Sequence, residues 1–221
     1  MRKFLLATVI VLILAVSSAI PRGINAQTDD KKAAPMDLPA PSRSGGMTLA
    51  EALATRRSVR SFTAAKLTQQ ELSQLLWSAQ GITDDKGHRT APSARAQYFL
   101  HLYVASADGF FAYIPAGHKL QRLAAKDVRA DLSSQAAVTS ASAVFVIAGD
   151  YDRASQGGRD VGLRWVNLEA GHAAQNLLLQ ATALHLGAVP VGGIQAEQVA
   201  QAASLPRGSV PIYLIPVGHA K

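Results

Sequence analysis

The positions of apolar side chains predict two short helices near the start of the folded part of the chain. Residues 48–51 and 68–71 each place a threonine three positions before a glutamate, the pattern of a capping box. The second box is followed by apolar residues at helical spacing, and Gly81 then ends the pattern. The expected apolar stripes are Leu49, Ala50, Leu53 and Ala54 in the first helix, and Leu72, Leu75, Leu76 and Ala79 in the second.

Strand patterns occupy the middle and the end of the chain. Residues 98–105 place apolar side chains at every second position, which predicts a half-buried strand, and residues 110–114 predict another short one. Residues 143–148 are continuously apolar and end at a glycine, which is typical of a strand covered on both faces. Residues 187–193 and 212–217 are expected to close the domain as strands.

Two further helices are expected between these strands. Residues 120–132 predict a helix with one polar face, and residues 163–186 predict a long one. Apolar residues of the long helix repeat at spacings of three and four, so we expect it to lie in the core or at a subunit seam. Because helices and strands intermix, the predicted class is α+β, with a mixed central sheet wrapped by helices.

The N-terminal residues have a different composition. Arg2 and Lys3 precede a 13-residue apolar stretch, Phe4 to Val16, and small residues suited to cleavage follow it. We therefore predict a secretory signal peptide over residues 1–26 and export to a periplasmic or extracellular location, with an uncleaved N-terminal membrane anchor as the alternative. Residues 27–47 are rich in proline and glycine and predict a flexible linker, which leaves residues 48–221 as one domain.

The amino-acid composition excludes or disfavours several classes of function. The chain has no cysteine, which excludes disulfides, thiolate nucleophiles and cysteine-ligated metals. The formal charge is +7, and it falls to +4 without residues 1–26, which contain three basic residues and no acidic one. So small an excess does not favour nucleic-acid binding. Association with anionic surfaces is a weaker alternative, and it predicts binding that disappears with salt.

Several common catalytic motifs are absent from the sequence. It contains no HExxH, GxGxxG, GxxxxGK[ST] or GxSxG pattern. Glu169 and His172 have the i, i+3 spacing of di-iron bundles, but those sites need a second Glu-x-x-His pair. A packed histidine, or one hydrogen-bonded to Glu169, is the favoured interpretation, and no metal site is predicted.

Residues 56–60, Arg-Arg-Ser-Val-Arg, are the strongest candidates for ligand binding. Guanidinium groups are planar and permanently charged, so they can bind a phosphate through paired hydrogen bonds. By itself the run favours a plainer interpretation, in which basic residues complement the end of a helix and Arg60 is solvated. Residues 91–96 and 189–193 consist mostly of small residues and glycine, which let a backbone approach a flat ligand; a loop and a bulge are the plainer interpretation of each.

Taken in order, these motifs resemble the FMN-dependent nitroreductase family, and in particular its SagB-type dehydrogenase branch. The likeness runs from about Leu49 to His219. The segments that carry it are 56–62 (RRSVRSF), 75–81 (LLWSAQG), 91–94 (APSA), 102–104 (LYV), 168–177 (LEAGHAAQNL), 187–193 (GAVPVGG) and 216–219 (PVGH).

The resemblance implies a nitroreductase-like fold and an intertwined homodimer with one FMN in each of two interface clefts. Arg56, Ser58 and Arg60, with Arg57 beside them, match positions that hold the flavin phosphate and ribityl chain. The other matched positions lie against the isoalloxazine ring (Pro92, Ser93, Ala94), at the ring's N5 edge (Pro190, Val191, Gly192, Gly193), and before the buried strand (Gln135).

The sequence departs from the family at four points. Ala96 stands where many relatives have an asparagine, and Gln156-Gly157 stands where azoline-oxidising members have Lys-Tyr. The basic C-terminal tail of many nitroreductases is missing, as in the SagB-type branch. These enzymes are usually cytoplasmic and often use NADH or NADPH, so the electron donor of an exported member is open.

Two functions are therefore expected. The first is an exported oxidoreductase in which hydride passes through flavin N5 between a reduced donor and a small organic acceptor, with no side-chain acid or base assigned. The alternative is a module that binds a flavin-like or anionic ligand on the same scaffold with little or no turnover.

Overall fold

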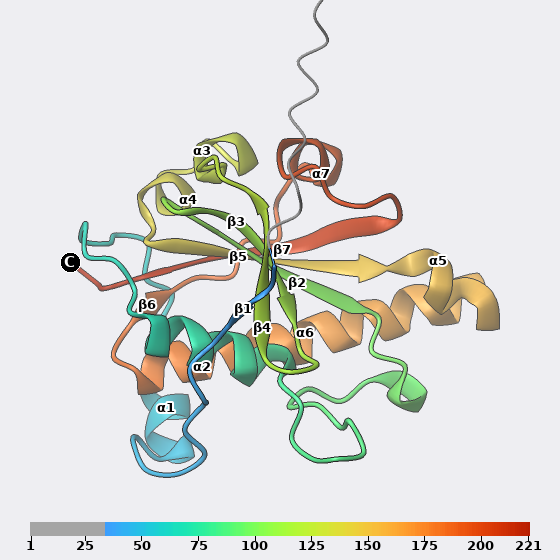
Figure 1. The fold of residues 1–221 in the computed structure, drawn as a ribbon, viewed down its shortest axis with the longest axis horizontal. Coiled ribbons are helices and arrows are strands. Elements are labelled where there is room, and N and C mark those ends of the chain that lie inside the picture. Colours follow the sequence, from blue (N-terminus) through green and yellow to red (C-terminus); the bar gives the residue numbers. More distant parts are fainter. Residues whose placement is uncertain (1–33) are drawn as a thin grey trace, which may run out of the picture. The chain divides into compact units, whose positions relative to one another are not determined.

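The computed structural model describes residues 34–221, so the predicted signal peptide and residues 27–33 of the predicted linker lie outside the described residues. One seven-stranded sheet forms the centre of the fold, in the order β1-β4-β3-β2-β5-β7-β6 (Figure 1). The strands are β1 (Met36–Asp37), β2 (Leu100–Ser106), β3 (Gly109–Ile114), β4 (Lys119–Ala124), β5 (Ala143–Asp150), β6 (Gly187–Ala188) and β7 (Ser209–Gly218).

Helices cover both faces of this sheet, which confirms the α+β class. Two helices, α2 (Gln69–Gln80) and α6 (Arg159–Ala183), lie on one face, and three short ones, α3 (Arg129–Leu132), α4 (Ala136–Ser140) and α7 (Ala196–Ala202), lie on the other (Figure 1). The remaining helices are α1 (Leu49–Thr55), α5 (Tyr151–Ala154) and the 3-10 turns η1 (Ala94–Ala96) and η2 (Ser155–Gly157).

The central strand β5 shows why its sequence is continuously apolar. Phe145 and Ile147 belong to the hydrophobic cluster under α2 and α6, whereas Val144 and Val146 belong to the cluster under the three short helices. Successive side chains of a strand point to opposite faces, so a strand buried on both faces needs apolar residues at every position. The prediction for residues 143–148 is confirmed, although the neighbours of β5 are antiparallel.

Both capping boxes are present. The Thr48 and Thr68 hydroxyls accept hydrogen bonds from the amides of Glu51 and Glu71. In turn, each glutamate carboxylate accepts a hydrogen bond from the backbone amide of its threonine. Leu75, Leu76 and Ala79 of α2 are buried as predicted and Leu72 is half-buried, but in α1 only Ala52 is buried. The predicted apolar stripe of α1 therefore does not enter the core of this chain.

Pairing within the sheet differs from the sequence prediction in two ways. All six strand pairs are antiparallel, so the parallel part of the predicted mixed sheet is limited to one isolated bridge, Ser58–Ala188. The predicted helix over residues 120–132 is wrong: β4 occupies its first part and α3 its end. The backbone of β4 pairs with β3 on one side and β1 on the other, and this tertiary pairing overrides the helical spacing.

The described part of the predicted linker lies against the domain. β1 pairs with β4 at Met36–Leu120, the Leu38 amide donates to the His118 carbonyl (3.1 Å), and the Ser42 amide donates to Gln74 Oε1 (2.8 Å). These bonds satisfy backbone groups of a segment whose sequence shows no periodicity. Among residues 34–221, no helix combines the length and apolar character that a membrane crossing needs.

Candidate functional site

The arginine-rich segment, residues 56–60, leaves α1 and runs beside β6. Ser58 forms the parallel bridge with Ala188, and the Val59 amide donates to the Ala188 carbonyl (3.0 Å). This approach depends on Gly187, where a Cβ atom would lie 2.6 Å from Val59 Cγ1. A glycine in β6 thus lets the segment pack directly onto the sheet edge.

The three guanidinium groups of this segment are not neutralised within the described chain. Arg57 donates to the carbonyl oxygens of Ala54 and Arg56 (3.0 and 2.8 Å), which are uncharged acceptors. No carboxylate of residues 34–221 forms an ion pair with Arg56, Arg57 or Arg60. Three fixed positive charges within five residues therefore lie at the surface, where a polyvalent anion can bind.

The glycine-rich segment, residues 190–193, extends from the same sheet edge. Val191 exchanges two backbone hydrogen bonds with Leu214 (2.8 and 3.0 Å) and is buried, which fixes the segment to β7. Gly192 and Gly193 beyond it are exposed, and a Cβ at Gly193 would meet no atom within 4 Å. Their backbone can therefore be approached by a flat ligand.

Gln135 lies towards the same end of the sheet. Along the sheet, Ser58 faces Ala188, Ala188 pairs with Val217, and Val217 pairs with Ala143 of β5. Gln135 is the exposed N-cap of α4, the short helix that leads into β5. Three of the four predicted segments are therefore grouped at one end of the sheet.

The fourth segment, residues 92–94, lies elsewhere. Ser93 Oγ donates to Glu169 Oε2 (2.6 Å) and accepts from the Tyr98 amide (2.8 Å), which ties this loop to the middle of α6. β6 follows the C-terminal end of the same helix, at Ala183. At 1.5 Å of rise per residue, Glu169 and Ala183 are separated by roughly 21 Å. A single chain does not bring residues 92–94 to the arginine-rich segment.

Comparison with known proteins identifies the family to which the chain belongs. The sequence profile of the nitroreductase family matches residues 53–219. A protein of Methanocaldococcus jannaschii assigned as a nitroreductase is 37% identical over 181 residues, which cover 77% of this chain and 90% of that protein. The chain belongs to the nitroreductase family. It is accordingly a nitroreductase-family oxidoreductase.

Solved structures agree with this family fold. A Ralstonia eutropha crystal structure assigned as a nitroreductase superposes with a TM-score of 0.80 at 32% identity, covering 85% of this chain and 90% of that one. The NADPH:FMN oxidoreductase of Vibrio harveyi, solved with NAD+, superposes with a TM-score of 0.59 at 23% identity, covering 78% and 69%. The second likeness concerns the fold alone.

The loop of this nitroreductase that carries residues 92–94 has an unusual backbone, which sequence reasoning missed. Arg95, Ala96 and Tyr98 all have positive φ angles (56°, 53° and 51°), a region that non-glycine residues enter at a cost of about 1–2 kcal/mol each. Such strain is found most often at functional sites. Ala96, one of the departures from the family pattern, is thus exposed on a strained turn.

Glu169 anchors this loop from the core. Its side chain is 1% exposed, and Oε2 accepts from both Ser93 Oγ and the Phe99 amide (3.2 Å) rather than from His172, which is exposed. Burial raises the pKa of Glu169, and Oε1 has no hydrogen-bond partner within the described structure. A carboxyl group in this setting favours its neutral form.

Next to this carboxyl group lies a second polar pair. Arg89 donates to Gln80 Oε1 (2.7 Å), and its guanidinium stacks on the Tyr98 ring at 4.5 Å. The spacing of Glu169 and His172 in the sequence did not predict that Glu169 binds Ser93, because Ser93 is 76 positions away in the chain.

Within residues 34–221, no three histidine, aspartate or glutamate side chains are grouped as a metal ion would require.

Proposed function

We propose that this protein is an FMN-dependent oxidoreductase whose flavin phosphate binds at the arginine-rich segment. The observation that supports this most strongly is the set of three guanidinium groups without carboxylate partners, beside an exposed glycine-rich backbone. A dianionic phosphate next to a flat ring system suits this pair of features.

The family resemblance suggests the roles of individual residues, and this arrangement is compatible with them. Arg56, Ser58 and Arg60 would hold the phosphate and ribityl chain, with Arg57 beside them, and Gln135 would contribute from the same end of the sheet. Pro190, Val191, Gly192 and Gly193 would face the N5 edge of the ring, where the backbone of the two glycines is exposed. FMN, when bound, supplies an atom that accepts and returns hydride; the protein binds it, orients it and excludes water.

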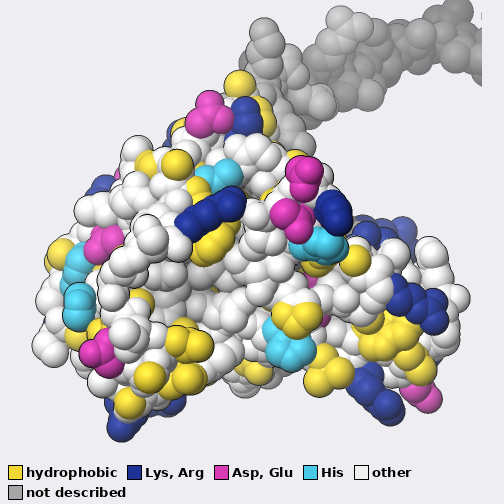
Figure 2. All heavy atoms as spheres, turned by 90° about the horizontal axis from the view of Figure 1, so that it is seen from below, with side chains coloured by type: hydrophobic (Ala, Val, Ile, Leu, Met, Phe, Trp, Pro, Cys, Tyr) yellow, Lys and Arg dark blue, Asp and Glu magenta, His cyan; other side chains and the backbone are white. Residues whose placement is uncertain are grey.

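We further propose that two copies of the chain form the complete site. Large hydrophobic side chains are exposed on α1 at Leu49 and Leu53 (66% and 55%) and on α6 at Val161 and Leu168 (41% and 55%). A groove of about 320 Å³ lies between α1, α2 and α6. Figure 2, which views the side of the molecule where α1 lies, has hydrophobic patches with Lys and Arg side chains beside them. Exposed apolar patches bordered by polar side chains are typical of interaction sites.

A two-fold dimer that pairs α1 and α6 with their copies would also explain how residues 92–94 and the arginine-rich segment, which are far apart in one chain, can form one site. Because α6 spans both half-sites, pairing this helix with its copy would bring Pro92, Ser93 and Ala94 of one chain to the arginine-rich segment of the other. An interface of two identical surfaces creates two such sites. The ring would then be held between the glycine-rich segment and the partner's loop.

The substrates are a reduced donor and a small organic acceptor, which react in turn at the same face of the ring. The Vibrio harveyi neighbour is named for NADPH and FMN, which supports a nicotinamide donor as the first to test. We assign the protein to the SagB-type branch from its 168–177 segment, and to an exported location from the signal-peptide pattern of residues 1–26.

A binding module with little turnover is the second candidate. It is favoured by Ala96 and by Gln156-Gly157, which replace family residues at positions expected near the ring. In this case the ligand would be held but not reduced.

An absorbance spectrum of the purified protein tests both candidates. An oxidoreductase gives flavin absorbance that bleaches on addition of NADH or NADPH and returns with a quinone or nitroaromatic acceptor. Flavin absorbance that neither NADH nor NADPH bleaches, and that only dithionite removes, favours the module. A colourless protein that takes up no added FMN contradicts both.

A further inference from the structure

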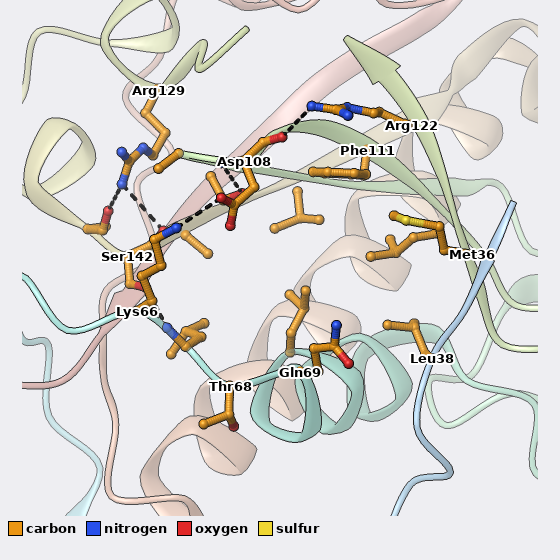
Figure 3. A pocket seen from close by; sticks show the side chains of 18 of the residues that line it. Met36, Leu38, Lys66, Thr68, Gln69, Asp108, Phe111, Arg122, Arg129 and Ser142 are labelled. Atoms are coloured by element: carbon orange, nitrogen blue, oxygen red, sulfur yellow. Dashed lines mark hydrogen bonds and ion pairs between the residues drawn. The ribbon is translucent and has the colours of Figure 1, made fainter. Parts of the chain in front are cut away.

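A second cavity lies away from the residues assigned to the flavin. Its volume is about 810 Å³, and it is enclosed by β1 and the residues after it, the N-terminal end of α2, and the β2–β3 and β4 edge of the sheet (Figure 3). None of the residues proposed to hold FMN lines it. Its size is within the range of small-molecule sites.

The inner wall of this cavity is apolar. Val104, Phe111 and Leu120 of the sheet are 1%, 8% and 4% exposed, so they form a firm floor that belongs to the main core. Leu38 and Leu72 pack against it from the N-terminal segment and from α2. Met36, which is 46% exposed, stands at the mouth. A ligand that reaches the floor therefore needs an apolar body.

Three basic side chains lie at the rim of the cavity, and they differ in whether a carboxylate neutralises their charge. Lys66 pairs with Asp108 (2.9 Å), and Arg129 pairs with Asp127 (2.7 Å). Arg122 instead donates to the backbone carbonyl of Asp108 (2.9 Å) and lies 5.9 Å from the centre of the Phe111 ring (Figure 3). No carboxylate of residues 34–221 forms an ion pair with Arg122.

We infer that this cavity is a second binding site, for a small amphipathic anion. The acidic group of the ligand would bind the Arg122 guanidinium, and its apolar body would lie over Phe111 and Leu72. A guanidinium that already spans a backbone carbonyl and a ring face is held in place, so it loses little freedom when it accepts an anion. The inference does not depend on flavin binding, because the two sets of residues are separate.

The apolar part of such a ligand can be an acyl chain or an aromatic ring. Dodecanoate and 1-naphthoate represent them, and dodecanol is the uncharged counterpart of the first. Binding to the full chain is measured by calorimetry in the presence of excess FMN, so that the probes cannot occupy the flavin cleft. We expect saturable binding of at least one anion, and weaker binding of dodecanol.

Arg122 is exposed, so its substitution leaves the core unchanged. Arg122→Gln should weaken binding of the anion by up to about fivefold, and Arg122→Lys should retain most of it, because a single exposed charge pair is worth up to about 1 kcal/mol. Arg207→Gln, which removes an exposed arginine outside the cavity, is the matched control and should leave affinity unchanged.

Three results would overturn the proposal. The first is that neither anion binds the FMN-saturated chain at 1 mM. The second is that Arg122→Gln binds the anions as tightly as the unaltered protein. The third is that Arg122→Gln changes the sedimentation coefficient, since this would assign the surface to contact between protein chains instead of a small ligand.

Discussion

The contact between Gly187 and Val59 determines where the arginine-rich segment lies, and it can be tested by adding one methyl group. In Gly187→Ala the new Cβ would stand 2.6 Å from Val59 Cγ1 and 2.9 Å from Val59 Cβ. Ordinary carbon contacts begin near 3.5 Å, so the segment must move by about 1 Å or Val59 must leave its rotamer. Overpacking of this kind costs about 1–3 kcal/mol.

Compensation by Val59→Ala makes the prediction specific. This substitution removes Val59 Cγ1, the atom that clashes first, and leaves Cβ in place, at a cost of its own of about 1–2 kcal/mol. The double variant Gly187→Ala/Val59→Ala should be more stable than the sum of the single changes by at least about 1 kcal/mol, as expected for residues in contact. Gly193→Ala adds a methyl group in open space nearby and is the control.

Urea unfolding followed by circular dichroism gives the free energies of unfolding of the unaltered protein and the four variants, and FMN titration reports the position of the arginines. Gly187→Ala should lose affinity for FMN, and the double variant should recover part of it. If Gly187→Ala unfolds within 0.3 kcal/mol of the unaltered protein, or if the two changes are strictly additive, the assignment of Gly187 is refuted.

Two further predictions concern the buried carboxyl group and the subunit contact. Since burial raises the pKa of Glu169 above its usual 4.5, the stability it contributes is complete below pH 4.5 and is lost as the pH rises through the folded-state pKa. Relative to Glu169→Gln, the unaltered protein should therefore be less stable at pH 8 than at pH 5 in urea unfolding, and parallel pH curves for the two proteins would contradict this. Leu168→Glu places a charge on exposed α6 surface and should shift the protein from dimer to monomer in analytical ultracentrifugation, whereas Val210→Glu, at a similarly exposed apolar position on β7, should not. An unshifted Leu168→Glu protein would remove this face from the interface.

Features that depend on neighbouring residues could be predicted from the sequence. The two capping boxes place the starts of α1 and α2 at Leu49 and Gln69, because the hydrogen bonds involved span only three residues. The buried strand at residues 143–148 is equally local, since burial on both faces requires an unbroken apolar run. The long helix was expected over 163–186 and is found at Arg159–Ala183.

Features that depend on distant residues could not be predicted. β4 contains helix-compatible residues, yet its backbone pairs with β1 and β3, and no local pattern encodes that choice. The bond between Ser93 and Glu169 joins two segments that the sequence treats separately. The same holds for the arginine-rich segment: its charge is evident in the sequence, but its place beside β6 follows from a glycine 127 positions beyond Arg60.

The central claim is that Arg56 and Arg60 bind the phosphate of FMN, and a comparison of FMN with riboflavin tests it most directly. The two ligands share the ring and ribityl chain, and only FMN carries the phosphate. Two charge-assisted contacts of about 1.5–3 kcal/mol each predict that the protein binds FMN at least about a hundredfold more tightly than riboflavin. This preference should disappear in Arg56→Ala/Arg60→Ala and persist in Arg207→Gln. Equal affinity for the two ligands in the unaltered protein, or an unchanged preference in the double variant, would contradict the claim.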